Sequence, residues 1–409
     1  MSRITDVLVL YQAYKRTAVM SSYFVKASKF VLPGCVVSEG YLEVIDGLFG
    51  EIVSELPEGA DVLDYSGCWV APGYVDTHIH GFAGHDVMDC DVDGLNEASV
   101  ELAKHGTTSW VATTLTQPAD QIKAACATVR EAVEARADDF MGANIDGIYL
   151  EGPFFTEKHK GAQNPDNMCD PDVDLFCDWQ EAAHGLICKS ALAPERDGST
   201  QYCATLHEMG VVVALGHSDA TYEQGMAAVA AGATAFVHTY NGMSGLNHRN
   251  PGLVGCAMTT SATYAEIICD GMHVLPGAIQ ALVRARGWEH VVLVSDCLRC
   301  GGMPAGDYFL GDFPIRLTGG LARLKLADGT LGSIAGSVLT LDQAVRNVVD
   351  WNIVTAEQGI RMASEVAAKS AGIDDICGMV LPGRSADFNV LDADLMVVDT
   401  FIGGMHVQK

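Results

Sequence analysis

The chain has 409 residues, of which 49% are hydrophobic and 19% are charged, a balance typical of a globular protein. Its 25 Lys and Arg residues against 52 Asp and Glu residues give a formal net charge of −27. Because such a charge repels polyanions, it argues against binding to nucleic acid and to anionic membranes. We also expect no membrane span and no signal peptide, because no apolar run is long enough and no small-residue cleavage site follows residues 6–11.

Cysteine usage indicates a reducing compartment. The chain has 13 cysteines, an odd number that cannot pair completely within one molecule, and a chain of this length needs no disulfides for stability. We therefore expect a cytoplasmic protein.

Both ends of the chain have the alternating pattern of short β-strands. The runs are residues 36–52, 61–70, 386–392, 396–401 and 405–408. They predict one small β-sandwich domain built from residues 1–70 and 377–409; two unrelated edge strands are the alternative. Residues 1–19 lack an evident partner and are interpreted as an extension, either a late natural start or an extra helix.

Between these ends, short apolar runs alternate with amphipathic helical segments. The expected strands are residues 74–80, 109–114, 147–151, 186–193, 211–216, 235–239, 265–269 and 291–295. The expected helices include residues 95–104, 119–135, 199–209, 221–231 and 276–286. Eight strands with intervening helices predict an α/β fold, a (β/α)8 TIM-type barrel over residues 71–376. A doubly wound open sheet reads similarly, but no Gly-x-Gly-x-x-Gly motif opens a helix here.

Ionisable residues stand at the carboxyl ends of six of these strands, the rim where barrel enzymes place their sites. They are His78 and His80, Glu151, His217, His238, His273 and Asp296. Residues two apart on a strand face the same side, so His78 and His80 can enter the barrel mouth together. Nitrogen and oxygen ligands of this kind suit Zn²⁺ or Fe²⁺, and the set predicts a metal site. The alternative for His217 and His238 is that they are hydrogen-bonded core histidines.

Asp296 follows an apolar strand that would bury any charge. A carboxylate beside a metal can take a proton from water and later deliver it to a leaving amine. The alternatives are a helix cap or a further metal ligand.

At this point the sequence resembles a known family. Ala71-Pro-Gly-Tyr-Val-Asp-Thr-His-Ile-His80 is similar to the opening metal motif of the amidohydrolase superfamily, and residues 381–392 are similar to its closing β segment. Further motifs resemble those of N-acetylglucosamine-6-phosphate deacetylases: Leu150-Glu-Gly-Pro-Phe154, Gly216-His-Ser-Asp-Ala220, His238-Thr-Tyr-Asn-Gly-Met243, Arg249-Asn-Pro-Gly252, Asp270-Gly-Met-His273 and Ile334-Ala-Gly-Ser337. The similarity runs from about residue 30 to the end, with the motifs in the family's order.

The resemblance implies metal-dependent hydrolysis of N-acetyl-D-glucosamine 6-phosphate to D-glucosamine 6-phosphate and acetate, a step of amino-sugar catabolism. By position, Glu151, His217 and His238 match the metal ligands shared by the members. His78 and His80 match a second metal site that only some members have, so one or two Zn or Fe ions per subunit are expected.

The resemblance also implies the remaining roles. Asp296 matches the catalytic acid/base, and His273 matches the residue that holds the substrate and polarises its amide. Asn241 and Gly242 match a loop that contacts the phosphate. Arg249 matches a phosphate-binding arginine that crosses to the neighbouring site of a homodimer.

Three further positions need separate comment. His248, beside the arginine, is expected to help hold the phosphate. Gln163 stands where many members have a His that touches the sugar, so we expect a substrate contact with a less certain sugar preference. Cys297 and Cys300 form a lone Cys-x-x-Cys, which is weak support for zinc or redox chemistry; small loop residues are the other interpretation.

Other functions stay open at this stage. N-acetylgalactosamine-6-phosphate deacetylation needs the same chemistry with a different contact to the sugar. A cyclic-amide hydrolase usually carries a carboxylated Lys where Glu151 stands here. A catalytically silent sugar-phosphate-binding relative would be expected to lack Asp296 or a ligand, and none is missing.

Overall fold

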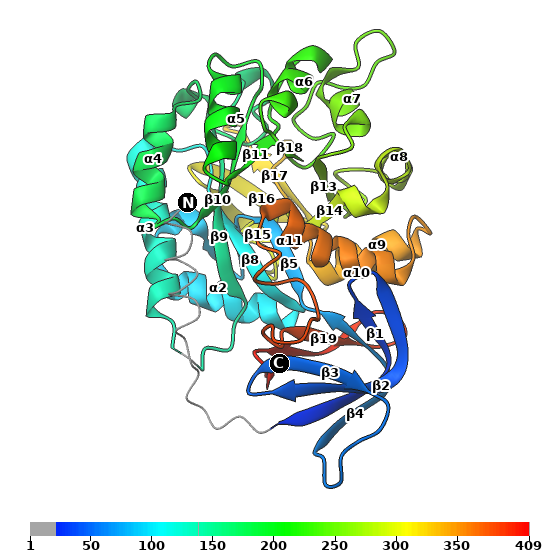
Figure 1. Cartoon of the computed structure of the whole chain (residues 1–409). Coiled ribbons are helices and arrows are strands. Elements are labelled where there is room, and N and C mark those ends of the chain that lie inside the picture. The colour runs from blue at the N-terminus through cyan, green and yellow to red at the C-terminus, as the bar shows by residue number, and fades with distance from the viewer. Residues whose placement is uncertain (1–21, 138, 409) are drawn as a thin grey trace.

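The structure of this chain is a computed structural model that describes residues 22–137 and 139–408. Figure 1 shows its main parts, a barrel surrounded by helices and, beside it, a sheet in which the blue N-terminal and red C-terminal strands lie together. The extension that the sequence suggested at residues 1–19 lies outside the described residues.

Eight parallel strands form the barrel, in the spatial order β14-β13-β12-β11-β10-β9-β8-β5. Their bounds are β5 Tyr74–Ile79, β8 Thr107–Thr113, β9 Asn144–Phe154, β10 Ile187–Leu192, β11 Val212–Leu215, β12 Ala235–Phe236, β13 Tyr264–Ile268 and β14 Val291–Val294. The first and last strands meet just beyond their carboxyl ends, where Asp296 N donates to His78 O at 2.8 Å and His80 N donates to Cys297 O at 2.9 Å. The predicted (β/α)8 barrel is therefore confirmed.

The barrel strands are buried on both faces, which explains their nearly continuous apolar sequence. All four residues of β14, Val-Val-Leu-Val, are buried, and so is every residue of β5 and β8. An ionisable residue in such a strand therefore has no route to water and must find a partner inside the protein.

Helices cover the outside of the barrel (Figure 1). They are α2 Val92–Lys104, α3 Ala119–Ala135, α4 Val173–Ala182, α5 Ser199–Glu208, α6 Tyr222–Ala230, α7 Gly252–Thr259, α8 Pro276–Arg286, α9 Leu341–Asp350, α10 Ala356–Met362 and α11 Glu365–Ala371. Short 3-10 turns occupy Val87–Asp89, Glu157–His159, Pro165–Asn167 and Trp288–His290. Side-chain caps start several of the helices; the Thr221 hydroxyl, for example, accepts from Gln224 N in a capping box. None of the described helices has the length and apolar character that crossing a membrane requires.

The strands of both chain ends form one seven-stranded sheet, in the order β21-β20-β19-β4-β1-β2-β3. Its strands are β1 Tyr23–Leu32, β2 Cys35–Ile45, β3 Leu48–Val53, β4 Val62–Pro72, β19 Phe388–Leu391, β20 Val397–Ile402 and β21 Met405–His406. Phe388 and Phe401 stack with their ring centres 4.4 Å apart in its core. Assembly of this domain from both termini is thus confirmed, while its division from the barrel at residues 70/71 and 376/377 stays a proposal.

A four-stranded antiparallel sheet follows the last barrel strand, and the sequence analysis did not predict it. Its strands are β15 Gly306–Leu310, β16 Phe313–Thr318, β17 Leu321–Lys325 and β18 Leu331–Ile334. Leu310, Ile315 and Leu317 bury their side chains in a cluster that includes Leu115, with Ala162 packed against it. The insertion therefore supports the segment that carries Gln163.

Two further short strands, β6 Gly81–Phe82 and β7 His85–Asp86, form a small hairpin directly after the first barrel strand. Its main chain is tied to the segment after the last strand, because Ala83 N donates to Gly301 O at 2.9 Å and Gly84 N donates to Arg299 O at 2.7 Å. The hairpin thus reinforces the closure of the barrel.

Candidate metal centre and active site

The ionisable residues predicted at strand ends do lie at the carboxyl ends of the barrel strands. His78 lies in β5, one residue before its end, His80 follows the strand, and Glu151 lies in β9. Each of the others comes shortly after its strand: His217 after β11, His238 after β12, His273 after β13 and Asp296 after β14. Three of these residues have a positive φ, namely His217 at 44°, His238 at 22° and Asp296 at 50°. Such backbone strain costs free energy and is concentrated at functional sites.

Six of these side chains form two buried triads. One triad is His78, His80 and Asp296, and the other is Glu151, His217 and His238. Within each triad the candidate ligand atoms all lie within 4.8 Å of one another, and all six residues are buried. The structure therefore contains two groups able to bind metal.

Glu151 joins the two triads. Its Oε1 lies 3.2 Å from the Nε2 atoms of both His217 and His238 and 3.3 Å from His78 Nε2, while its Oε2 lies 3.3 Å from His80 Nε2. Asp296 Oδ1 lies 3.5 Å from His78 Nε2 and 3.3 Å from His80 Nε2 on the other side. The Glu151 carboxylate therefore contacts the histidines of both triads.

These distances fit a divalent metal better than a purely protein network. Ligand bonds of about 2.0–2.1 Å in a tetrahedral site place neighbouring ligand atoms about 3.3 Å apart. The Nε2 atoms of His217 and His238 lie 3.1 Å apart, close to that spacing, and His78 Nε2 is buried without a hydrogen-bond partner. Since a buried polar atom without a partner is costly, an ion at this point would satisfy it.

The charges of the centre are strongly perturbed by one another. Burial would lower the pKa of His78, but the carboxylates of Glu266 and Glu151 hold it well above its usual value. The pKa of His80 is likewise about 9, because Asp296 and Glu151 outweigh burial. Burial would raise the pKa of Glu151, and the surrounding imidazoles hold it well below its usual range. The carboxylates of the centre therefore stabilise positive charge placed among them.

Asp296 is held in its strained conformation by the segment after β18. Ser337 N donates to Asp296 O at 2.8 Å, and the Ser337 hydroxyl donates to Ser295 O at 2.5 Å. Gly336, with a φ of 73°, packs so closely that an added Cβ would lie 2.7 Å from Leu298 Cδ2 and 3.1 Å from Asp296 O. These contacts fix the backbone that carries the acid/base candidate.

His273 is aimed by Asp270. The Asp270 carboxylate lies 2.6 Å from His273 Nδ1 and accepts the main-chain N–H of His273 at 2.8 Å. The opposite nitrogen, Nε2, is buried and has no hydrogen-bond partner. With Nδ1–H held by the carboxylate, a second proton on Nε2 makes that atom a donor to a bound molecule.

Gln163 lies against a metal-ligand candidate. Its side-chain N–H donates to Glu151 Oε2 at 2.6 Å, and its Oε1 accepts from Thr116 N at 2.8 Å. The side chain is buried, so both ends of its amide are engaged within the protein. The structure thus brings Gln163 into the metal centre.

The predicted phosphate-binding residues divide into two places. Asn241 and Gly242 adjoin the centre, since a Cβ at Gly242 would lie 3.1 Å from His217 Nδ1, and Asn241 has a buried Nδ2 without a partner. His248 and Arg249 are exposed at the tip of a turn closed by Asn247 and Asn250. The described residues of this chain provide no ion pair for Arg249, and the structure does not bring it to the triads.

The residues that contact the ligand candidates from neighbouring strands were not predicted from the sequence. Glu266 Oε2 lies 2.9 Å from His78 Nδ1 and accepts His238 N at 3.0 Å, and Lys189 donates to the other oxygen of Glu266. Burial and the neighbouring cations together leave the pKa of Glu266 at about 2. The available signal was an ionisable residue within each of two apolar strands, β13 and β10.

Glu195, after β10, was also missed. Its carboxylate accepts the hydroxyls of Thr156 at 2.7 Å and Ser218 at 2.6 Å, and Asp219 N at 2.6 Å. Glu195 thereby holds the turn that carries His217 through hydrogen bonds to the next two residues.

Cys297 and Cys300 are both buried free thiols, and neither belongs to a triad. Burial raises the pKa of Cys297 well above its usual value and that of Cys300 to about 11, which leaves both thiols protonated. Their surroundings favour small buried loop residues over redox chemistry.

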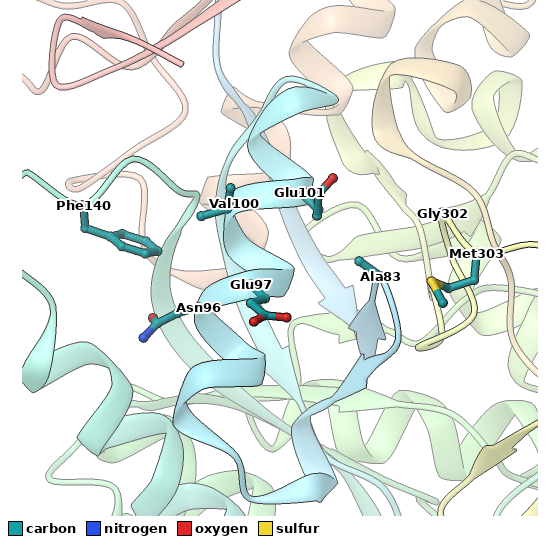
Figure 2. A pocket seen from close by; sticks show the side chains of 8 residues that line it. All are labelled: Ala83, Asn96, Glu97, Val100, Glu101, Phe140, Gly302 and Met303. Carbon is teal, nitrogen blue, oxygen red and sulfur yellow. The ribbon is translucent and has the colours of Figure 1, made fainter. Parts of the chain in front are cut away.

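A surface pocket of about 520 Å³ lies apart from this centre. Figure 2 shows Glu97, Val100 and Glu101 along helix α2 on one side of it and Met303 opposite, with Phe140 at its edge. None of the proposed ligands lines this pocket, so it is no part of the candidate active site.

Comparisons with known proteins agree with this geometry. The model of the amidohydrolase family matches residues 69–407. An N-acetylglucosamine-6-phosphate deacetylase of Vibrio furnissii is 40% identical over 85% of this chain and 85% of its own length. An N-acetylgalactosamine-6-phosphate deacetylase of Escherichia coli O157:H7 is 37% identical over 90% of this chain and 96% of its own.

Among solved structures, an N-acetyl-D-glucosamine-6-phosphate deacetylase from Mycobacterium smegmatis, determined with N-acetyl-D-glucosamine-6-phosphate, superposes with a TM-score of 0.88. It is 30% identical, and the match covers 95% of this chain and all of that one. The chain therefore belongs to the amidohydrolase family and, within it, to the N-acetylglucosamine-6-phosphate deacetylases.

Proposed function

We propose that this protein removes the acetyl group of N-acetyl-D-glucosamine 6-phosphate, releasing D-glucosamine 6-phosphate and acetate. The observation that carries the proposal is the convergence of two buried triads of ligand atoms with Asp296 in one of them. The family of the chain supports it, because relatives 34–40% identical over most of the chain are named as deacetylases of this substrate.

We further propose Zn or Fe as the metal, with one or two ions per subunit. Imidazole and carboxylate ligands suit either ion. Glu151, His217 and His238 would hold one ion, and His78 and His80 the other. A divalent cation bound there lowers the pKa of a water and polarises a carbonyl group.

The protein's own groups then perform the proton transfers. The Asp296 carboxylate accepts a proton from the attacking water as its oxygen bonds to the acetyl carbon. The Nε2–H of His273 donates to the carbonyl oxygen, where negative charge develops. Asp296 next gives its proton to the amide nitrogen, the C–N bond breaks, and the products are acetate and the sugar amine.

The phosphate requires positive charge or N–H donors. We propose that the unpartnered side-chain amide of Asn241 and the main chain at Gly242 contact it beside the centre. His248 and Arg249 stand on an exposed turn; we assign both to phosphate binding, and Arg249 to the neighbouring site of a homodimer. An exposed arginine can reach a phosphate on another subunit without loss of its own packing.

We assign the protein to the cytoplasm. All thirteen cysteines are free thiols, six of them exposed or partly buried and seven buried. Thiols persist in a reducing compartment.

The deciding experiment measures acetate release from a panel of N-acetylhexosamines, with metal analysis of the same sample. The panel contains the 6-phosphates of N-acetylglucosamine and N-acetylgalactosamine and both unphosphorylated sugars. We expect the highest kcat/KM for N-acetylglucosamine 6-phosphate and metal in the active sample. A higher kcat/KM for N-acetylgalactosamine 6-phosphate would make that sugar the substrate. Binding of the sugar phosphates without acetate release would identify the protein as a catalytically silent relative.

A further inference from the structure

A buried ion pair lies inside the barrel, and the proposed reaction makes no use of it. Lys189 of β10 donates from Nζ to Glu266 Oε1 of β13. Lys189 is 0% exposed and Glu266 is 1% exposed. Taking two charges out of water costs folding free energy, and an apolar pair of similar volume is often at least as stable. The pair therefore calls for a role other than stability.

The second oxygen of Glu266 contacts both triads. Glu266 Oε2 lies 2.9 Å from His78 Nδ1, in the triad with Asp296. The same oxygen accepts the main-chain N–H of His238 at 3.0 Å, in the triad with Glu151. One carboxylate thus holds the ring of one ligand candidate and the backbone of another.

The contact with His78 selects which ring nitrogen can bind a cation. An imidazole that binds a metal ion carries one proton, and the carboxylate of Glu266 can hold that proton on Nδ1. This leaves the lone pair on Nε2, which is buried without a hydrogen-bond partner and lies 3.3 Å from Glu151 Oε1. Carboxylates that orient a metal-binding histidine in this way raise metal affinity.

Lys189 balances the charge of this carboxylate. Its ammonium group also lies 4.3 Å from the centre of the Tyr149 ring, whose centre is 5.0 Å from that of His78. Lys189, Tyr149 and Glu266 thus pack against one another, and the last two contact the ring of His78.

We propose that Glu266 is a positioning residue that orients His78 and the backbone of His238 for metal binding, with Lys189 as its charge partner. The proposal rests on the metal dependence of the proposed function. If the ion pair were only structural, metal affinity would not depend on Glu266. If Glu266 positions the ligands, metal affinity depends on its carboxylate, whether or not a lysine stands beside it.

The test compares Glu266→Gln, Lys189→Met and the double variant by competition of Zn²⁺ with a chelator, without substrate. We expect the metal dissociation constant to rise about 10- to 100-fold in Glu266→Gln. The unfolding midpoint of the metal-free protein falls in either single variant, because each removes one partner of a buried ion pair. In the double variant that midpoint recovers while the metal dissociation constant stays raised. The visible spectrum of the Co²⁺ protein reports the changed ligand geometry independently.

A matched control comes from Glu365 of α11, another buried glutamate, which contacts Arg361 at 2.7 Å and Lys369 at 2.6 Å. Glu365→Gln lowers the unfolding midpoint and leaves the metal dissociation constant unchanged. Wild-type metal affinity in Glu266→Gln or in the double variant would overturn the proposal, and so would a wild-type protein that binds no metal. Metal binding without acetate release by the wild type would instead overturn only the proposed function.

Discussion

Asp296 combines three features expected of a group that moves protons. It is buried, its φ is 50°, and its Oδ1 faces the Nε2 atoms of His78 and His80. Burial would raise the pKa of this carboxyl, but the hydrogen bond from His80 and the nearby imidazoles lower it. The carboxyl group is therefore ionised in the resting site, which is the form that can accept a proton.

We predict that Asp296→Asn lowers kcat at least about 100-fold, because the amide has the same shape but cannot accept and return a proton. Metal content, measured by elemental analysis of the purified variant, should remain near that of the wild type. Loss of the metal in this variant would show that Asp296 is chiefly a ligand, and near-normal turnover would remove it from the mechanism.

Gln163 is the residue whose sequence-based role the geometry modifies most. Its amide already donates to Glu151 and accepts from Thr116. Removal of that amide should free the Glu151 carboxylate to rotate. We predict that Gln163→Ala raises the metal dissociation constant several-fold and changes KM less, and chelator competition and steady-state kinetics measure the two effects.

The control for Gln163 is Gln180 of α4, whose amide is similarly engaged at both ends, with Ile187 N and Ile187 O at 2.9 Å each. Gln180→Ala should leave metal affinity unchanged. A larger KM for the sugar with unchanged metal affinity in Gln163→Ala would return the residue to the role of a substrate contact.

Arg249 is exposed, and its proposed partner is the phosphate of the substrate. Hydrogen bonds between charged groups contribute about 1.5–3 kcal/mol, which corresponds to about 10- to 100-fold in affinity. We predict that Arg249→Ala raises KM for the phosphorylated sugar by about that factor and leaves KM for the unphosphorylated sugar nearly unchanged.

Arg284, exposed on α8, supplies the control for a general loss of charge. Its replacement by Ala should change neither KM. Equal effects of Arg249→Ala on both substrates would refute phosphate binding. A wild-type protein that is monomeric at assay concentrations would place the arginine in its own subunit's site or in none.

At the scale of elements, the segment after β18 acts as a clamp on the last barrel strand. Ser337 hydrogen-bonds on both sides of Asp296, to Ser295 O through its hydroxyl and to Leu298 N through its carbonyl, and Gly336 packs against the same turn. The intervening four-stranded sheet returns the chain to the end of β14, so the insertion positions the acid/base candidate without touching it.

We predict that Gly336→Ala lowers both kcat and the free energy of unfolding, the latter by more than about 1 kcal/mol. An Ala at a φ of 73° is strained, and its Cβ would press on Leu298 and on the main chain of Asp296. Denaturant unfolding and acetate release measure the two effects.

Gly210 provides a control that has the backbone strain of Gly336 without its close packing. Its φ is 77°, and nothing lies within 4 Å of an added Cβ. Gly210→Ala should therefore lose about 1 kcal/mol of stability from backbone strain and keep wild-type kcat. If Gly336→Ala also keeps wild-type kcat, the clamp has no part in placing Asp296.

At the scale of the whole molecule, the net charge of −27 opposes any anion that approaches from a distance. A single phosphate is nevertheless compatible with it, because cations and N–H donors at the barrel mouth act at short range. Surface acids farther than about 10 Å are largely screened at ordinary salt. The charge therefore excludes extended polyanions more strongly than a small sugar phosphate.

We predict that KM for the sugar phosphate changes only modestly between low and high ionic strength. The long-range field is unfavourable and screened, whereas the contacts that hold the phosphate are local. Initial rates at several salt concentrations check this, with the unphosphorylated sugar as the control. A KM that falls severalfold with added salt would show that the global charge limits binding.

The sequence by itself determined much of this protein, because local patterns specify local structure. The apolar strand of residues 291–294 and the helical segments predict a barrel, and a barrel requires that strand ends meet at one rim. That requirement was enough to predict that His78, Glu151 and Asp296 lie together. Strand β12 has only two residues and is shorter than the predicted strand of residues 235–239. His238 nevertheless lies just after it, at the rim of the barrel.

Only the tertiary structure decided which side chains of different segments contact one another. The contact of Gln163 with Glu151 and that of Glu266 with His78 join residues 12 and 188 positions apart. The insertion of residues 306–334 was also not predicted, although the alternating burial of β15 and β16 shows that these strands pack through one face. Periodicity reports which face of an element is buried, whereas the side chain it meets depends on the register and closure of the whole barrel.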